Sequence, residues 1–296
     1  MTTTTNAHLD VNRRHDFVLL FDVTDGNPNG DPDAGNLPRI DPETMQGLVT
    51  DVSLKRKVRD WVDVAKGEEA RFKIYVQRES YLTETRGRVF GDRADAQPAE
   101  KQRWMCDEFY DIRMFGAVMS MREHNAGQVR GPLQLTFARS VDPIIPLDSS
   151  IARVALESRG ETPEGQEVND LAAPTHGTLG RKATVPYGLY RGQGFFNPHF
   201  GQRTGVIEED LALFWQAIQN MWDLDRSASR GMMALQRLYV FSHESSLGNA
   251  PAHRLFQRIG VRRKDSVDVP RSISHYTVTV DDTDLPEGVT LTRLVE

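Results

Sequence analysis

The sequence predicts an α+β fold, a modified ferredoxin-like domain with two long insertions. The strongest segments follow in the order strand, helix, strand, strand, helix, strand, which is the ferredoxin-like pattern. Hydrophobic residues make up 39% and charged residues 26% of the 296 positions, and the mean hydropathy of -0.50 is typical of a globular protein with a buried core. Insertions are expected at about 67–131 and about 145–183, where the pattern is interrupted.

The N-terminal third contains the first strand and the first helix. Residues 16–24, DFVLLFDVT, are almost continuously apolar and rich in β-formers, which predicts a central strand. A loop rich in Gly, Pro, Asn and Asp follows from 25 to 47. Helical spacing predicts a helix at 51–66 with an inward face of Leu54, Val58, Trp61, Val62 and Ala65. Residues 71–78 alternate as a strand does, with Phe72, Ile74 and Val76 on one face.

The second half supplies the remaining elements. Alternating Leu133, Leu135 and Phe137 predict a strand at 133–141. A strand and loop are expected at 184–196, and further strands at 235–244 and 275–280. The apolar stripe of 207–223 predicts a helix whose first turn is favoured by Glu208, Glu209 and Asp210. Two stretches have weaker patterns: 79–131 contains one expected helix near 99–110, and 148–182 is a Gly- and Glu-rich extension.

Composition also limits the class of protein. No apolar run approaches the roughly 20 residues that span a bilayer, and the first residues lack the apolar stretch of a signal peptide, so a cytoplasmic protein without membrane contacts is expected. The single cysteine, Cys106, excludes an internal disulfide framework and a Cys-rich zinc site.

The charges are sorted along the chain. The net charge of -6 argues against an acidic partner, but two stretches, 171–207 and 245–264, contain no Asp or Glu. Their cations are Arg181, Lys182, Arg191 and Arg203 in the first, and Arg254, Arg258, Arg262, Arg263 and Lys264 in the second. A chain sorted in this way can present a basic groove. An ordinary solvated surface remains the alternative.

Three segments could contact phosphates or bases. In SLKRKVRDW, Lys55 and Arg59 stand one helical turn apart beside Arg56, which suits successive phosphates, although a solvated basic face has the same pattern. In AGQVRGP, Arg130 between two glycines can form an anion-binding nest or a simple hairpin turn. In the third segment, bases could stack on the aromatic residues and the glycines could admit a strand, with core packing as the alternative. This segment contains Tyr187, Tyr190, Arg191, Phe195 and Phe196, with Gly188, Gly192 and Gly194 between them.

No motif indicates a cofactor, a metal or catalysis. The loop from Asp25 to Asp33 imitates a calcium-binding EF-hand, but Asn36 stands where a bidentate Glu is needed, so ordinary turns are the favoured interpretation. The phosphate-loop, zinc-protease and nucleophile-elbow motifs are absent. His243 beside Glu244 is interpreted as a strand histidine with satisfied hydrogen bonds.

Long segments resemble one family. They are the opening stretch from DFVLLFDVT through SLKRKVRDW, then GPLQLTFARSVDPI, GRKATVPYGLYRGQGFF and DRSASRGMMALQRLYVFSHESSLGNAPAHRLF. Together they resemble the type I-C members of the CRISPR-associated backbone family, part of the RAMP superfamily. They cover most of the chain outside 79–110 and 150–178.

The resemblance implies a fold and a function. The fold is a single elaborated RNA-recognition-motif domain over 1–296, with a palm sheet, a finger-type insertion at about 67–131 and a thumb-type arm at about 145–183. Several copies, together with the other type I-C subunits, are expected to hold one CRISPR RNA by its backbone, so that target DNA pairs with the exposed bases.

The resemblance also implies site residues. The family's S-L-K-R-x-x-R signature assigns RNA contacts to Ser53, Lys55, Arg56 and Arg59. Other matching segments contain Arg181, Lys182, Arg191 and Arg230. No enzymatic activity is expected. The alternative is a ribonuclease that uses Asp31 or Asp33, as type III relatives use a loop Asp. Lys55→Glu combined with Arg59→Glu is predicted to abolish RNA-dependent assembly and to leave the fold intact.

Overall fold

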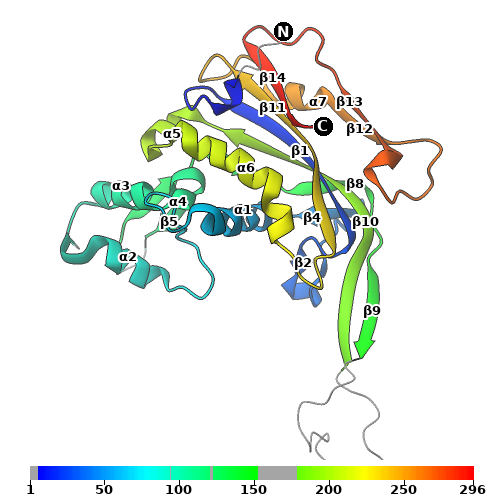
Figure 1. Cartoon of the computed structure of the whole chain (residues 1–296), viewed down its shortest axis with the longest axis horizontal. Helices are drawn as coiled ribbons and strands as arrows, with labels where there is room; N and C mark the ends of the chain where they lie inside the picture. Colours follow the sequence, from blue (N-terminus) through cyan, green and yellow to red (C-terminus); the bar gives the residue numbers. More distant parts are fainter. Residues whose placement is uncertain (1–5, 94, 121–122, 153–178) are drawn as a thin grey trace, which may run out of the picture.

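A computed structural model describes residues 6–93, 95–120, 123–152 and 179–296. Its centre is an eight-stranded antiparallel sheet that follows the path β14-β11-β1-β10-β8-β4, with β7 and β9 also paired to β10 (Figure 1). Its strands are β1 (His15–Gly26), β4 (Gln46–Val49), β7 (Leu133–Leu135), β8 (Ala138–Pro143), β9 (Leu147–Ala152), β10 (Leu179–Phe196), β11 (Met232–His243) and β14 (Val289–Val295).

The predicted strand at 16–24 is confirmed as the central strand β1. It pairs with β10 on one side and β11 on the other, and these two strands confirm the predictions at 184–196 and 235–244. Both faces of β1 are covered, since Phe17, Leu19 and Phe21 are as fully buried as Val18 and Leu20. This explains why its sequence is apolar without alternation.

Helices α1 (Asp51–Lys66) and α6 (Glu208–Leu224) pack on one face of the sheet and bury the larger core (Figure 1). Both confirm the predicted helices. Thr50 is the N-cap residue of α1, and its Oγ1 accepts a hydrogen bond from the backbone N–H of Ser53 at 3.2 Å. Of the predicted inward face, Leu54, Val58 and Val62 are buried, whereas Ala65 is exposed because the last turn of α1 extends past the core.

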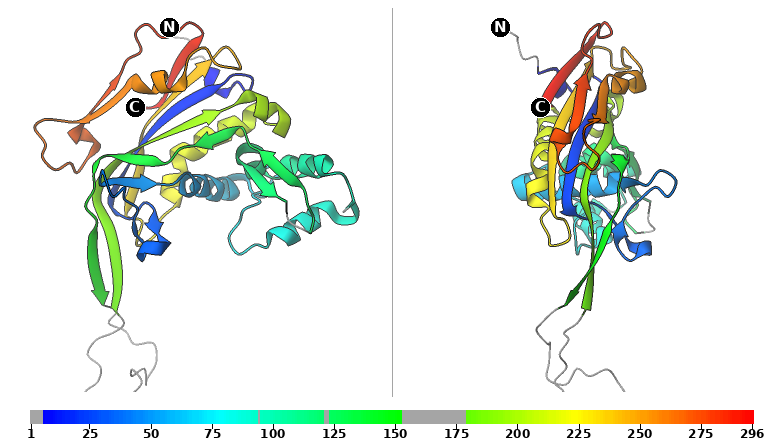
Figure 2. Two further views of the ribbon diagram at one scale, coloured as in Figure 1. Left: turned by 180° about the vertical axis from the view of Figure 1, so that it is seen from behind. Right: turned by 90° about the vertical axis from the view of Figure 1, so that its right-hand side faces the viewer.

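The opposite face of the sheet is covered by the C-terminal segment (Figure 2). This segment contains α7 (Ala252–Gln257), β12 (Ile259–Arg263) and β13 (Tyr276–Val280). The predicted strand at 275–280 is therefore present, but it pairs with β12 in a separate two-stranded sheet. The central sheet lies between two apolar clusters as a result.

The segment 75–129 has an apolar cluster of its own. Tyr75, Phe90, Met105, Cys106, Phe109, Ile112, Met119, Ala126 and Val129 are buried together. Its elements are α2 (Leu82–Phe90), α3 (Pro98–Glu108), α4 (Tyr110–Phe115), β5 (Gly116–Met119) and β6 (Gly127–Arg130). Helix α3 confirms the helix expected near 99–110. No helix in the described ranges is long and apolar enough to cross a membrane.

Two strand predictions differ from the structure. Residues 71–78 form only an isolated bridge from Lys73 to Phe109. The buried carboxylate of Asp111 accepts hydrogen bonds from the backbone N–H groups of Tyr75 and Val76 at 2.8 and 3.1 Å. These N–H groups are therefore not available to pair with a neighbouring strand. The strand predicted at 133–141 is divided into β7 and β8 by Thr136 and Phe137.

A two-stranded arm projects from the sheet (Figures 1 and 2). It is formed by β9 and the first part of β10, which pair from Leu147 opposite Thr184 to Ala152 opposite Leu179. The rest of the predicted extension, 153–178, lies outside the described residues. The remaining short elements are β2 (Gly30–Asp31), β3 (Leu37–Pro38) and α5 (Pro198–Thr204).

Candidate nucleic-acid interface

A continuous groove runs along α1. It consists of two adjoining cavities of about 670 and 570 Å³ that share Arg56, Lys57, Arg78, Asp225 and Arg230 in their linings. One cavity extends to the end of α6, and the other extends to the loop at 29–32 and to Phe137. We call the two together the α1 groove.

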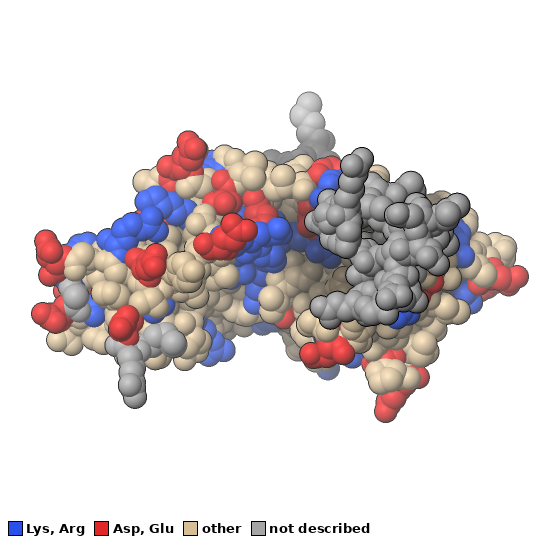
Figure 3. Space-filling view, turned by 90° about the horizontal axis from the view of Figure 1, so that it is seen from below, with Lys and Arg blue, Asp and Glu red and all other residues tan. Residues whose placement is uncertain are grey.

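Positive charge gathers in the α1 groove. Seven cationic side chains line it against four acidic ones, on a chain whose net charge is -6. The cations are Arg39, Arg56, Lys57, Arg59, Arg78, Arg226 and Arg230, and the acids are Asp51, Asp60, Asp63 and Asp225. Figure 3 shows Lys and Arg gathered in a hollow that Asp and Glu border. Such a hollow attracts an anionic strand.

The structure brings four of the sequence-predicted residues to this groove: Ser53, Arg56, Arg59 and Arg230. Arg56 pairs with Asp60 at 2.8 Å and donates to the carbonyl of Val76 at 3.0 Å. Arg230 donates to the carbonyls of Asn27 and Pro28 at 3.1 and 2.9 Å. Both guanidinium groups are therefore held in place beside the groove.

Sequence reasoning missed Lys57, the most buried cation of the groove. Its side chain is only 3% exposed and pairs with Asp225, whose carboxylate also accepts from Nε of Arg230 at 3.0 Å. Burial and the nearby Arg230 lower the pKa of Lys57 to about 7, while contact with a carboxylate favours the charged form. A lysine between the buried Leu54 and Val58 was the available signal.

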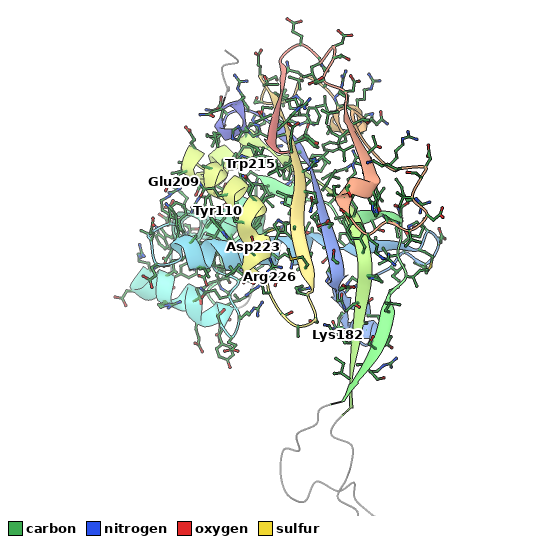
Figure 4. The ribbon with its side chains drawn as sticks, turned by 45° about the vertical axis from the view of Figure 1, so that its right-hand side comes forward. Tyr110, Lys182, Glu209, Trp215, Asp223 and Arg226 are labelled. Atoms are coloured by element: carbon green, nitrogen blue, oxygen red, sulfur yellow. The ribbon has the colours of Figure 1, made fainter. Side chains whose placement is uncertain are left out.

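Sequence reasoning also missed Arg39, Arg78 and Arg226, because nothing in the residues next to them marks them as contacts; Arg39 and Arg226 lie in segments that carry the family resemblance. They come from separate segments that only folding brings together. Figure 4 shows Arg226 beside Asp223 at the end of α6, and these two side chains form an ion pair. Arg78 pairs with Asp60 and is 73% exposed.

Lys55 and Arg59 have protein partners of their own. The amine of Lys55 lies 3.1 Å from Asp51 and 3.0 Å from the side-chain oxygen of Gln134. Nε of Arg59 donates to the buried Asp111 at 2.8 Å. The expectation that Lys55→Glu with Arg59→Glu leaves the fold intact does not fit this arrangement, since a glutamate would face a buried carboxylate.

Three further predicted residues lie outside the α1 groove. Arg130 in β6 stacks on the ring of Phe200, 4.3 Å from its centroid. Arg181 and Lys182 on the β10 arm line a separate cavity of about 150 Å³ together with residues of the loop at 27–37, and Arg181 pairs with Asp148. Figure 4 shows Lys182 on this arm, away from Arg226.

The segment around Arg191 belongs to the core. Arg191 donates to the carbonyls of Ile259 and Phe256 at 2.8 and 2.6 Å, on the sheet face that the C-terminal segment covers, and burial lowers its pKa. Tyr187, Tyr190 and Phe196 are buried. The nearby glycines make room for protein: a Cβ on Gly194 would lie 2.1 Å from the ring of Phe17. For these buried residues the structure confirms core packing, the alternative interpretation of this segment.

Polar groups of the loop at 25–33 form hydrogen bonds and an ion pair within the protein. Oδ1 of Asn29 accepts from the backbone N–H and the hydroxyl of Thr50, both at 2.9 Å. Asp31 accepts the N–H of Asp33 at 3.2 Å and lies 3.4 Å from Arg39. Across the described ranges, no group of three or more His, Cys, Asp or Glu residues could hold a metal ion. These contacts favour the turn interpretation.

The prediction for His243 is confirmed. Its Nδ1 accepts the backbone N–H of Asn249 at 2.9 Å, so Nε2 carries the proton and donates to Asp16, also at 2.9 Å. Arg14 pairs with the same buried carboxylate at 2.8 Å. His243 is a structural residue with both ring nitrogens satisfied.

The fold and the α1 groove define an α/β protein with a basic groove of the kind that holds a nucleic-acid backbone. Residues 13–281 match the family model described as CRISPR-associated protein Cas7, so the chain belongs to the Cas7 family. The "CRISPR-associated protein Cas7" of Haloferax volcanii is 26% identical over 313 aligned residues, which cover 96% of this chain and 84% of the relative.

A solved structure is similar in fold. A chain of a "CRISPR RNA-guided surveillance complex, pre-nicking" has a TM-score of 0.50 and 14% identity, and the match covers 77% of this chain and 78% of that one. The likeness shows a shared mixed α/β fold with a central antiparallel sheet.

Proposed function

We propose that this chain is a repeated, non-catalytic backbone subunit of a type I-C CRISPR surveillance complex and binds CRISPR RNA along its sugar–phosphate backbone. The α1 groove is the observation that carries the proposal, because seven cationic side chains from separate parts of the chain line it against four acidic ones, while the whole chain is negative by six. Phosphates need such a concentration of cations, and contacts to phosphates do not depend on base sequence. Membership of the Cas7 family agrees with this function.

The groove residues are the proposed RNA contacts. Ser53, Arg56, Arg59 and Arg230 line it, and the structure adds Arg39, Lys57, Arg78 and Arg226. Arg181 and Lys182 remain proposed contacts on the arm, and the RNA contacts of Lys55 and Arg130 remain predictions. Arg191 is the least suited, because it lies on the sheet face that the C-terminal segment covers and donates there to the carbonyls of Ile259 and Phe256.

We also propose the hand-like division of the fold. The order β11-β1-β10-β8, with α1 before β8 in the chain and α6 between β10 and β11, supports a ferredoxin-like palm of the RNA-recognition type. The insertion with its own apolar cluster supports a finger. The projecting β9–β10 arm supports a thumb.

The same proposal includes the partners. Target DNA pairs with the bound RNA, and further copies and the other type I-C subunits are the protein partners, in the cytoplasm. The subtype rests on the segments around SLKRKVRDW and GRKATVPYGLYRGQGFF. A ribonuclease that uses Asp31 or Asp33 is not favoured, because Asp31 is engaged within its own loop.

Charge reversal in the groove tests the proposal. Arg78→Glu with Arg226→Glu changes two partly exposed groove residues, and Arg254→Glu with Arg262→Glu makes the same charge change on the C-terminal segment. Each pair is measured for affinity to single-stranded RNA across salt concentrations and for assembly with RNA and sibling subunits. The groove pair should bind weakly, with a salt slope smaller by about 1.4 if each arginine contacts one phosphate. Equal behaviour of the two pairs would refute the proposal.

A further inference from the structure

Phe137 is an exposed aromatic ring at the mouth of the α1 groove. Its side chain is 52% exposed, although strand alternation predicted it on a buried face with Leu133 and Leu135, which are buried. Phe137 lines the same cavity as Arg39 and Arg56. An apolar ring therefore stands in water directly beside the cations of the groove.

The backbone around Phe137 is held by hydrogen bonds. The N–H of Thr136 donates to the carbonyl of Gln193 at 2.9 Å, and the hydroxyl of Thr136 accepts the N–H of Gln193 at 3.3 Å. The same hydroxyl donates to the carbonyl of Phe137 at 3.1 Å. The next residue, Ala138, pairs with Val49. Phe137 thus projects from a fixed break between β7 and β8, and the sheet determines its exposure.

The cavity has a second exposed apolar residue. Val52, in the first turn of α1, lines this cavity and is 66% exposed. Arg39, Arg56 and Arg230 line it as well. The lining thus combines exposed apolar side chains with cations, and the cavity volume of about 570 Å³ is within the range of small-ligand sites.

A single nucleic-acid strand matches both the apolar and the cationic residues of this lining. Its phosphates suit the arginines, and an unpaired base presents a flat apolar face to an aromatic ring. Every base has such a face, so a phenylalanine, which has no hydrogen-bonding group, can hold any base. A folded duplex does not match, because its bases are already stacked and paired.

We propose that Phe137 stacks against an unpaired base of the RNA strand whose phosphates lie in the α1 groove. The inference rests on the proposed function and adds to it a contact that holds a base without selecting its identity. Affinity for RNA then has two parts: a salt-dependent part from the arginines and a stacking part from Phe137 that depends little on salt.

The test compares two strands of about 12 nucleotides, one with bases and one an abasic ribose–phosphate chain of equal length. The full chain and the variants Phe137→Ala and Phe137→Trp are titrated against both by fluorescence anisotropy. Phe137→Ala should weaken binding of the strand with bases by about 5- to 100-fold and leave binding of the abasic strand unchanged. Phe137→Trp should retain affinity. The control is Tyr81→Ala, which removes a 73% exposed aromatic ring of the insertion.

The outcomes separate this inference from the function on which it rests. Failure of the unaltered chain to bind either strand would overturn both. Normal binding with no difference between Phe137→Ala and Tyr81→Ala would overturn the stacking contact alone. An equal loss for both strands would also overturn it, because Phe137 would then act through the shape of the groove. Loss of subunit assembly without loss of RNA affinity would identify a protein contact instead.

Discussion

Asp210→Asn tests the buried ion pair that joins α4 to α6. Arg113 and Asp210 are both fully buried, and two nitrogens of Arg113 lie 3.0 and 2.5 Å from the two carboxylate oxygens. Arg113 also donates to the carbonyls of Cys106 and Arg71 at 2.6 and 2.9 Å. Oδ2 of Asp210 accepts the N–H of Ile207 at 2.9 Å and so begins α6. Asparagine keeps the size of this side chain and removes its charge.

The expected loss is large because Arg113 cannot leave the core. An uncompensated buried charge costs about 3–5 kcal/mol, a large fraction of the roughly 5–15 kcal/mol that stabilises a typical protein. The matched control is Glu209→Gln, one residue earlier. Glu209 is 52% exposed and pairs with Lys66 at the surface, where an ion pair contributes under about 1 kcal/mol.

Urea unfolding of the two variants, followed by tryptophan fluorescence, measures the difference in free energy of unfolding. The midpoint should fall strongly for Asp210→Asn and hardly at all for Glu209→Gln. If the free energies of unfolding of the two variants differ by less than about 1 kcal/mol, the buried pair does not hold α4 against α6.

Three further predictions concern stability and reactivity. Burial lowers the pKa of His15 from 6.5 to about 4. Between these two pH values the unfolded chain binds a proton that the folded chain does not, so the free energy of unfolding should fall by roughly 3 kcal/mol as the pH drops from 6.5 to 4. In urea unfolding, the stability of His15→Gln should depend less on pH. Gly194→Ala should lose about 1–3 kcal/mol by displacing the ring of Phe17, whereas Gly180→Ala, whose Cβ would lie 3.9 Å from its nearest neighbour, should melt at the normal temperature. Burial raises the pKa of Cys106 to about 12, so at about pH 8 iodoacetamide should label the unfolded chain, and rapid labelling of the native chain would contradict its burial.

The sequence pattern predicted an element correctly where the residues that determine it lie within one segment of the chain. The helix at 51–66 was predictable because its apolar spacing and the Thr50 cap lie within a single segment. The strand at 16–24 was predictable because burial on both faces removes alternation. By contrast, the apolar alternation of 71–78 was misleading, since a distant side chain, Asp111, takes the place of a neighbouring strand.

Only some residues of the candidate site could be predicted from the sequence pattern. The basic helix identified Arg56 and Arg59, but the same pattern included Lys55, which turns toward Gln134. Cations at separate places in the chain, Arg78 and Arg226, could not be grouped without the fold. The aromatic segment near Tyr190 is core, and the exposed ring at the groove is Phe137.

The strongest strands and helices, the family and the basic helix were predictable from the sequence, because they depend on residues that are neighbours in the chain. Which cations share one groove, and which are partners of buried acids, depends on how the chain folds. Charge neutralisation and burial depend on distance in space, and residues such as Lys57 and Asp225 become neighbours only after the chain has folded.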